Sequence, residues 1–184
     1  MPRIPTPATT ADAPEASRTL LDAVSKQLGS VPNMFRAVSL SPHALKGYLD
    51  LSGALSHGAL PAATRERIAL AIAEINGCGY CLSAHTYLGR HLARLDDADI
   101  AASRAGASTD PKADAAVRFA ALVARMRGQV SDADFAAVKE AGYTDAQVIE
   151  IVQHVALNTF TNLFNEVFQT EIDFPVVRPG IHAA

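Results

Sequence analysis

Several features that would define a class of protein are missing from this 184-residue sequence. No segment approaches the ~20 uninterrupted apolar residues of a membrane-spanning helix, so we expect no membrane segment. The first residues lack the apolar stretch of a secretory signal, which predicts a cytoplasmic protein. Two cysteines are too few for a disulfide framework. The net charge of −3 argues against a nucleic-acid partner, because phosphate binding needs clustered Lys and Arg.

The composition indicates a globular, helical chain. Hydrophobic residues make up 49% of the sequence and charged residues 19%, which excludes general disorder. Ala is abundant, and no long alternating run of Val, Ile, Thr and aromatic residues indicates a strand. We therefore predict an all-α fold with one compact multi-helix domain over residues 17–184. A proline-rich N-terminal arm, residues 1–16, should be extended and either flexible or wrapped around a partner.

Gly and Pro breaks, with Ser and Thr caps, divide the domain into helices. The caps expected from the sequence include Ser41, Ser131 and a capping box of Thr144 with Gln147. A short apolar piece over 34–40 and an extended tail over 170–184 complete the chain. The expected helical ranges are 17–28, 42–56, 61–75, 78–95, 97–104, 111–127, 131–141 and 144–169.

The last predicted helix is apolar over most of its circumference. No Lys or Arg occurs between Thr144 and Asp173. A helix of this kind is buried in its own core or against another subunit, and a small domain has little room to enclose one, so we expect a homo-oligomer. The same helix carries an uncharged polar stripe that faces solvent, a subunit interface or the active site. The stripe consists of His154, Asn158, Asn162, Asn165 and Gln169.

The two cysteines, Cys78 and Cys81, stand three positions apart at the head of a predicted helix. Residues at this spacing share a helix face, so the sulfurs can meet and close a small disulfide. His85 continues the same face. A helix N-terminus stabilises a thiolate, and a nearby imidazolium lowers a thiol pKa further, or a neutral imidazole accepts the proton. The helix dipole alone favours Cys78 as the more acidic thiol, because Cys78 is nearer the helix start.

Two glutamates of the preceding helix are candidates for a carboxylate that acts with His85. Glu66 lies twelve residues before Cys78, and the break at 76–77 turns the chain back, so the two helices can pack together. A carboxylate there can reach His85 or a bound water and relay protons. Glu74 lies on a similar face and is the rival. Glu66 can equally be an ordinary surface residue.

Two other interpretations of the cysteine pair remain open. Cys78, Cys81 and His85 could hold zinc, with Glu66 or His91 as the fourth ligand. The two cysteines could also be inert buried thiols, since free cysteine is often buried. Neither interpretation needs the two sulfurs to react with each other.

The arrangement of these residues resembles the carboxymuconolactone decarboxylase superfamily, in its alkylhydroperoxidase D-like, peroxidase-related branch. The matching pattern is Glu, eleven residues, Cys, two residues, Cys, three residues, His, here Glu66, Cys78, Cys81 and His85. The flanking segments VPNMFRAVSLSPHALKGYLDLSGAL, HVALNTFTNLFN and TEIDFP are also similar to that branch. Together they cover most of residues 31–175.

The resemblance implies an all-helical alkylhydroperoxidase D-like fold that assembles as trimers or hexamers. It implies a thiol peroxidase that reduces organic hydroperoxides, with an external dithiol or thiol as reductant and with no metal or organic cofactor. Cys81 would attack the peroxide, Cys78 would resolve the product, and Glu66 with His85 would relay protons. This order of the cysteines opposes the dipole argument above. Tyr80 stands where some members have a His, so the resemblance does not support a further proton relay at this position.

Two rival functions share the same residues. A disulfide-exchange or redox-sensing module would use the cysteine pair with little peroxidase turnover. A non-redox scaffold or decarboxylase-type enzyme would not need the cysteines, although the decarboxylase branch itself lacks the pair.

Overall fold

A computed structural model describes residues 1–180, which form one 3-10 turn, nine α-helices and no strand. The predicted all-α class is therefore confirmed. None of the helices in this range is both long and apolar enough to cross a bilayer. The 3-10 turn is η1 (Thr10–Asp12), and the helices are α1 (Glu15–Leu28), α2 (Asn33–Val38), α3 (Pro42–Ser56), α4 (Ala62–Ile75), α5 (Gly79–His91), α6 (Asp97–Arg104), α7 (Pro111–Arg125), α8 (Asp132–Glu140) and α9 (Asp145–Phe168).

Most helix boundaries agree with the expected ranges because their caps are as predicted. The hydroxyl of Ser41 accepts from the backbone of Ala44, and Ser131 and Thr144 form capping boxes. Helix α5 is the exception, since it ends at His91 rather than near residue 95. The chain turns at Arg94, which has a φ of 60°, and Leu95 folds back onto Gly89. Burial of Leu95 in the core therefore ends the helix early.

Helix α4 is the centre of the fold because it belongs to two hydrophobic cores. Seven consecutive residues, 68–74, are buried. One side of α4 packs with α7, α8 and α9 around residues such as Ile72 and Val117. The other side packs with α1, α2, α3 and α5 around residues such as Leu45 and Leu82. Burying each of these large side chains contributes about 1.5–3 kcal/mol, so the position of α4 is fixed from both sides.

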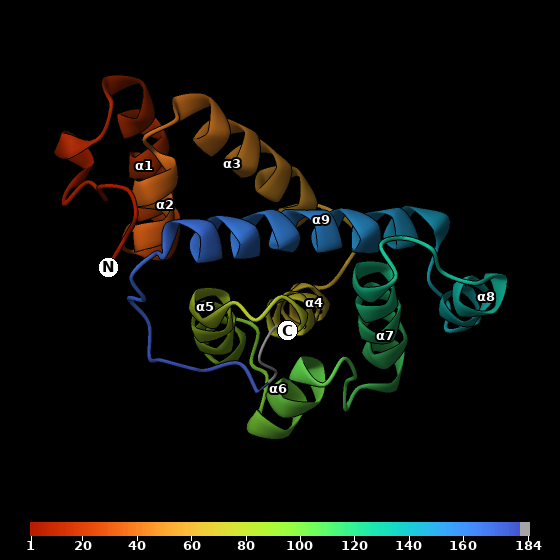
Figure 1. The fold of residues 1–184 in the computed structure, drawn as a ribbon. Helices are drawn as coiled ribbons and strands as arrows, with labels where there is room; N and C mark the ends of the chain where they lie inside the picture. The colour runs from red at the N-terminus through yellow and green to blue at the C-terminus, as the bar shows by residue number, and fades with distance from the viewer. Residues whose placement is uncertain (181–184) are drawn as a thin grey trace.

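Helix α9 runs the length of the molecule, with α1, α2 and α3 on one side of it and α4 to α7 on the other (Figure 1). An ordinary surface helix buries its apolar face and exposes its polar face, whereas α9 buries polar side chains and exposes apolar ones. His154, Asn158, Asn162 and Asn165 are at most 5% exposed. Five large apolar side chains are instead 41–62% exposed, and they are Ile149, Val152, Phe160, Leu163 and Val167. We call these five residues the α9 apolar face.

The two ends of the described chain pack against the helices. The arm is folded onto its own chain: the backbone N–H of Arg3 donates to the carbonyl of Phe168, and Ala13 is buried. The tail is extended over residues 170–180, as predicted, and residues 181–184 of that prediction lie outside the described residues. Backbone N–H groups of Val177 and Gly180 donate to Ser83 Oγ and to a Glu74 carboxylate oxygen, respectively. The tail is therefore fastened across α4 and α5.

Candidate active site

The turn between α4 and α5 sets the position of the cysteines. Asn76 ends α4, and Gly77 follows with a φ of 68°, a left-handed conformation that favours glycine. The N–H of Cys78 then donates to the carbonyl of Ala73. Cys78 is the N-cap of α5, and its Sγ accepts from the backbone N–H of Cys81 at 3.4 Å. The sequence break predicted at residues 76–77 therefore places both sulfurs at the start of one helix.

The two thiols are free, buried and unequal in acidity. A hydrogen bond from the Cys78 thiol lowers the pKa of Cys81 to about 6, and the His85 charge and the Asn165 and Asn162 amides add to this against the opposing effect of burial. The same hydrogen bond, together with burial, raises the pKa of Cys78 well above its ordinary value. The hydrogen bond from the Cys78 thiol and the amides of α9 thus oppose the expectation from the helix dipole alone, that Cys78 is the more acidic thiol.

His85 and Glu66 form a hydrogen-bonded pair beside Cys81. The Nδ1 atom of His85 lies 2.9 Å from Oε2 of Glu66, so the two helices α4 and α5 meet at this contact. Burial alone would lower the pKa of His85, but the Glu66 carboxylate and the Cys81 sulfur together raise it. Glu74, the rival carboxylate, accepts instead from Arg104 at 2.7 Å and helps to fasten the tail. Geometry thus pairs His85 with Glu66.

Amide side chains of α9 complete the surroundings of the Cys81 sulfur. Nδ2 of Asn165 donates to Cys81 Sγ at 3.3 Å. Oδ1 of Asn162, one turn earlier, accepts from Nδ2 of Asn76 at 2.8 Å. The polar stripe of α9 therefore faces the active site over this part of its length rather than solvent. Gln169, its last member, is exposed.

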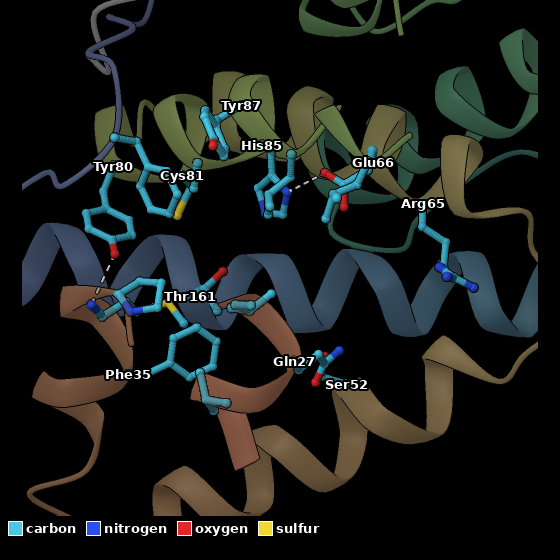
Figure 2. Close-up of a pocket in the computed structure, with 18 of the residues that line it drawn as sticks. Gln27, Phe35, Ser52, Arg65, Glu66, Tyr80, Cys81, His85, Tyr87 and Thr161 are labelled. Carbon is cyan, nitrogen blue, oxygen red and sulfur yellow. Dashed lines mark hydrogen bonds and ion pairs between the residues drawn. The ribbon is translucent and has the colours of Figure 1, made fainter. Parts of the chain in front are cut away.

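A cavity of about 580 Å³ opens beside Cys81 and lies between α5 and the helices α1 to α3. Figure 2 shows Cys81, His85 and Glu66 in sequence along one wall, with Phe35 opposite and Arg65 at the far end. The wall is rich in aromatic rings. The aromatic lining residues are Phe35, Tyr48, Tyr80, Tyr87 and Phe174.

Cys78 does not line this cavity and has no exposed surface. The tail passes over the start of α5, where a side chain at Gly79 would contact Ile172 and Pro179. Tyr80 fixes the tail further, since its hydroxyl donates to Asp173 Oδ1 at 2.8 Å and accepts from the backbone N–H of Met34 at 3.1 Å. The tail therefore covers one cysteine and leaves the other facing the cavity.

The four residues singled out in the sequence, Cys78, Cys81, His85 and Glu66, lie together in this site. Among residues 1–180, no group of three or more His, Cys, Asp and Glu side chains is arranged to hold a metal ion, so the zinc interpretation finds no support. His91 is in the cavity wall and its ring packs against that of Tyr87 at a tilt of 45°, with centroids 4.3 Å apart. Sequence reasoning did not single out Tyr48 and Phe35, although both lie in the flanking segment that resembles the family, whereas the asparagine spacing on α9 did signal Asn165.

The family comparison covers the centre of this site. A family model for the carboxymuconolactone decarboxylase family matches residues 42–125. This range runs from α3 to the end of α7 and includes Glu66, both cysteines and His85. No curated protein matches the chain significantly.

Solved structures match the chain over nearly its whole length. An alkylhydroperoxidase AhpD core, peroxidase-related protein from Ralstonia eutropha JMP134 is 27% identical, covers 94% of this chain and 92% of that one, and has a TM-score of 0.83. A peroxidase-related protein from Silicibacter sp. TM1040 is 24% identical over 92% and 93% of the two chains, with a TM-score of 0.76. A cysteine-to-alanine variant of the debrominase Bmp8 in complex with 2,3,4-tribromopyrrole is 19% identical over 94% of each chain, with a TM-score of 0.77.

The two structures below 25% identity show a shared fold only. The Ralstonia structure and the family match add sequence similarity that includes the motif region. Over residues 42–125 the chain is therefore similar to the carboxymuconolactone decarboxylase family, and over nearly its whole length it is similar to an alkylhydroperoxidase AhpD core, peroxidase-related protein.

Proposed function

We propose that the protein is a thiol peroxidase that reduces organic hydroperoxides with Cys81 as the attacking residue. The observation that carries the proposal is the contrast between the two thiols. Cys81 faces the cavity with a pKa lowered to about 6 by the Cys78 thiol and its other neighbours, whereas Cys78 lies beneath the tail as the donor. A thiolate at neutral pH is the nucleophile that peroxide reduction needs.

The first step uses His85 as a proton carrier. His85 takes the proton of the Cys81 thiol, and Glu66 stabilises the resulting imidazolium through Nδ1. The thiolate attacks the outer oxygen of R–O–O–H, so an S–O bond forms and the O–O bond breaks. The departing alkoxide receives the proton from His85 and leaves as the alcohol. Cys81 is then a sulfenic acid, oxidised by two electrons.

The second step joins the two sulfurs. The Cys78 sulfur attacks the sulfur of the sulfenic acid, a disulfide forms, and the hydroxyl group leaves as water with the Cys78 proton. An external dithiol then reduces the disulfide and is itself oxidised. The contact of 3.4 Å from the Cys81 N–H to Cys78 Sγ supports this step, because both cysteines lie in the first turn of one helix and little movement of the backbone is needed.

The cavity supports an organic hydroperoxide as the substrate. Its volume of about 580 Å³ lies within the range of about 300–1,000 Å³ that is typical of small-molecule sites. Aromatic rings such as Phe35 and Tyr48 offer an apolar surface to the organic group. Hydrogen peroxide would leave most of this surface without a contact.

Burial of Cys78 argues against the rival of disulfide exchange with a folded partner protein. In such exchange an outside thiolate must reach one of the two sulfurs in line. Cys78 has no exposed surface, and Cys81 is 3% exposed and is reached through the cavity. A small dithiol fits that route better than a protein surface does.

The α9 apolar face supports assembly of several copies of the chain. Five large apolar side chains, 41–62% exposed on one helix, are more than scattered surface residues and are typical of a protein–protein contact. No Lys or Arg interrupts this helix. We propose that a second copy covers this face in a homo-oligomer.

The test of the peroxidase proposal is consumption of cumene hydroperoxide with a small dithiol as reductant. The native chain should turn over, and Cys81→Ser should not. Without the dithiol, Cys78→Ser should consume about one equivalent and stop at the sulfenic acid, because its resolving thiol is missing. Equal turnover by the native chain and Cys81→Ser would refute the thiol mechanism, and no turnover above background by either protein would favour the non-redox scaffold.

A further inference from the structure

Two buried amides of α9, Asn162 and Asn165, lie next to the Cys81 sulfur without being part of the Glu–Cys–Cys–His motif. Asn165 is 2% exposed and Asn162 is 1% exposed. Nδ2 of Asn165 is 3.3 Å from Cys81 Sγ and donates to it. An asparagine in a dry interior is costly unless its amide is used, so two of them beside one reactive atom call for a reason.

The orientation of Asn162 is fixed from the other side. Its Oδ1 accepts from Nδ2 of Asn76, the residue that ends α4 just before the cysteines. Its own Nδ2 is therefore turned away from Asn76, and it lies near enough to the Cys81 sulfur to help lower the pKa of that thiol without completing a well-formed hydrogen bond within residues 1–180. Oδ1 of Asn165 also lacks a partner there. The amide pair thus keeps one free donor and one free acceptor in the interior at Cys81.

We propose that Asn165 and Asn162 form an uncharged cradle for the Cys81 sulfur, in which Asn165 holds the thiolate and the two free amide atoms hold the oxygen that the peroxide delivers. The oxygen part rests on the proposed peroxidase function, whereas the thiolate part does not. Asn165 is a catalytic residue in this scheme because it contacts the reacting sulfur, and Asn76 is a positioning residue because it acts through Asn162.

The chemistry of the two free atoms matches a sulfenic acid. The S–O–H group has one hydrogen to donate and oxygen lone pairs to accept, so it can donate to Asn165 Oδ1 and accept from Asn162 Nδ2. The reduced thiol has no oxygen, so neither atom has a well-formed hydrogen bond in this structure. Transfer of the outer peroxide oxygen to sulfur, with the proton of His85 passing to the alkoxide, would satisfy both atoms in one step.

A neutral donor suits this position better than a cation. Hydrogen bonds to an ionised group are the strong ones, and an amide offers one without a second buried charge. The ionisable groups that act on Cys81 include Cys78, Tyr80 and His85 of α5 and Tyr48 of α3, with Glu66 of α4 behind His85 and Glu166 of α9 near Cys78. His85 is the one cation among them, and it must give up its proton to the alkoxide. The amides keep their donors throughout the cycle.

The thiolate part is tested without any peroxide. The rate at which iodoacetamide alkylates Cys81, followed by mass spectrometry as a function of pH, gives the pKa of this thiol. Asn165→Leu should raise that pKa by about one unit or more, because one hydrogen bond to a charged group is lost. Asn165→Asp, which keeps the shape but adds a negative charge, should raise it further. An unchanged pKa in either folded variant would overturn the role of Asn165.

Asn158 provides the matched control. It is 5% exposed on the same helix, and its Nδ2 donates to the carbonyl of His154 rather than to sulfur. Asn158→Leu should leave the Cys81 pKa unchanged. An equal rise of the Cys81 pKa in Asn158→Leu would show that any substitution of a buried residue in α9 raises this pKa. That result would refute a specific role of Asn165.

The oxygen part is tested in a Cys78→Ser background, where a sulfenic acid cannot be resolved. After one equivalent of cumene hydroperoxide, dimedone labelling over time gives the lifetime of the sulfenic acid. Asn162→Leu should shorten this lifetime about tenfold, the effect of losing one ordinary hydrogen bond. An unchanged lifetime would overturn the oxygen part. If no sulfenic acid forms with Asn162 intact, the peroxidase proposal fails, and the alkylation experiment still decides the role of Asn165.

Discussion

Oε2 of Glu66 lies 2.9 Å from Nδ1 of His85, so a carboxylate of α4 orients an imidazole of α5 beside the Cys81 thiol. With Nδ1 engaged, Nε2 is the ring nitrogen left for proton exchange with sulfur and alkoxide. The carboxylate also raises the pKa of His85 against the lowering effect of burial. These two effects, on orientation and on charge, lead to the first prediction.

Replacing Glu66 by Gln should lower the pKa of His85, because the buried ring loses its negative partner. Hydroperoxide turnover should fall by about 10²-fold, a typical contribution of a positioned acid–base group. An NMR titration of the His85 ring gives the pKa, and steady-state rates give the turnover. Glu74→Gln is the control: it should reduce stability through loss of the Arg104 pair but leave the His85 pKa unchanged. A larger effect of Glu74→Gln on that pKa would reverse the assignment.

Replacing Cys78 by Ala should make Cys81 less acidic. The Cys78 thiol is the largest cause of the lowered Cys81 pKa, so without this donor the pKa should rise from about 6 toward its usual value. Cys81 in the native chain is a thiolate above that pH and a thiol below it, and the variant should need a higher pH for the same change. Thiolate absorbance as a function of pH measures the Cys81 pKa in the native chain and in the variant. Identical titration curves would contradict the hydrogen bond between the two sulfurs.

The Arg67–Asp99 ion pair should be a stability determinant away from the site. Its atoms are 2.6 Å apart, and both side chains are at most 12% exposed. Asp99→Ala should lower the free energy of unfolding by about 3–5 kcal/mol, because a buried arginine is left unpaired. Chemical denaturation measures the difference. Asp97→Ala is the control, since its pair with Arg90 is exposed and should contribute about 1 kcal/mol or less.

The Arg67–Asp99 ion pair should also make the stability of the fold depend on pH. Burial opposes ionisation of Asp99, but hydrogen bonds from Ser108 and Thr109 and the charge of Arg67 lower its pKa below the ordinary value. A carboxyl with a lowered pKa in the folded state stabilises the fold above its unfolded pKa, and this contribution is lost as pH falls through the folded value. The acid unfolding of Asp99→Ala should therefore be less steep than that of the native chain. Equal slopes would contradict this contribution.

Leu163→Lys, in the α9 apolar face, should dissociate the proposed homo-oligomer. Leu163 is 58% exposed in the single chain, so a lysine there costs the fold little but places a charge in any contact between copies. Light scattering after gel filtration measures the mass. Met126→Lys is matched, because Met126 is 51% exposed but lies outside this face. A native chain that runs as a monomer, or equal masses for all three proteins, would refute assembly through α9.

The helices and the motif were predictable because their signals are local. Ser41, Ser131 and Thr144 cap helices through neighbours three residues away, and the break at residues 76–77 acts on the turn that contains it. The early end of α5 was not predictable, because Leu95 folds back to satisfy the core rather than a local preference. The spacing of Cys78, Cys81 and His85 likewise predicted only the part of the site that lies on α5.

The acidity of Cys81 depends on residues distant in sequence. Asn165 stands 84 positions after Cys81, and its direction is set by how α9 packs on α5. The polar stripe on α9 could be predicted from the sequence. Whether it faces solvent, a subunit interface or the active site could be decided only from the fold. The covering of Cys78 by the tail depends in the same way on hydrogen bonds such as that from Val177 to Ser83.

The covering of Cys78 has a kinetic consequence for the proposed peroxidase. Cys78 is buried at the start of α5, where the tail over residues 170–180 packs, and Cys81 is reached only from the cavity beside Phe35 and Tyr48. The oxidant and the reductant must therefore enter through the same cavity. The alcohol has to depart before the dithiol can come in, so turnover should follow a ping-pong order. Parallel lines in double-reciprocal plots, and inhibition by excess dithiol competing with the hydroperoxide, are the signatures of such a shared passage.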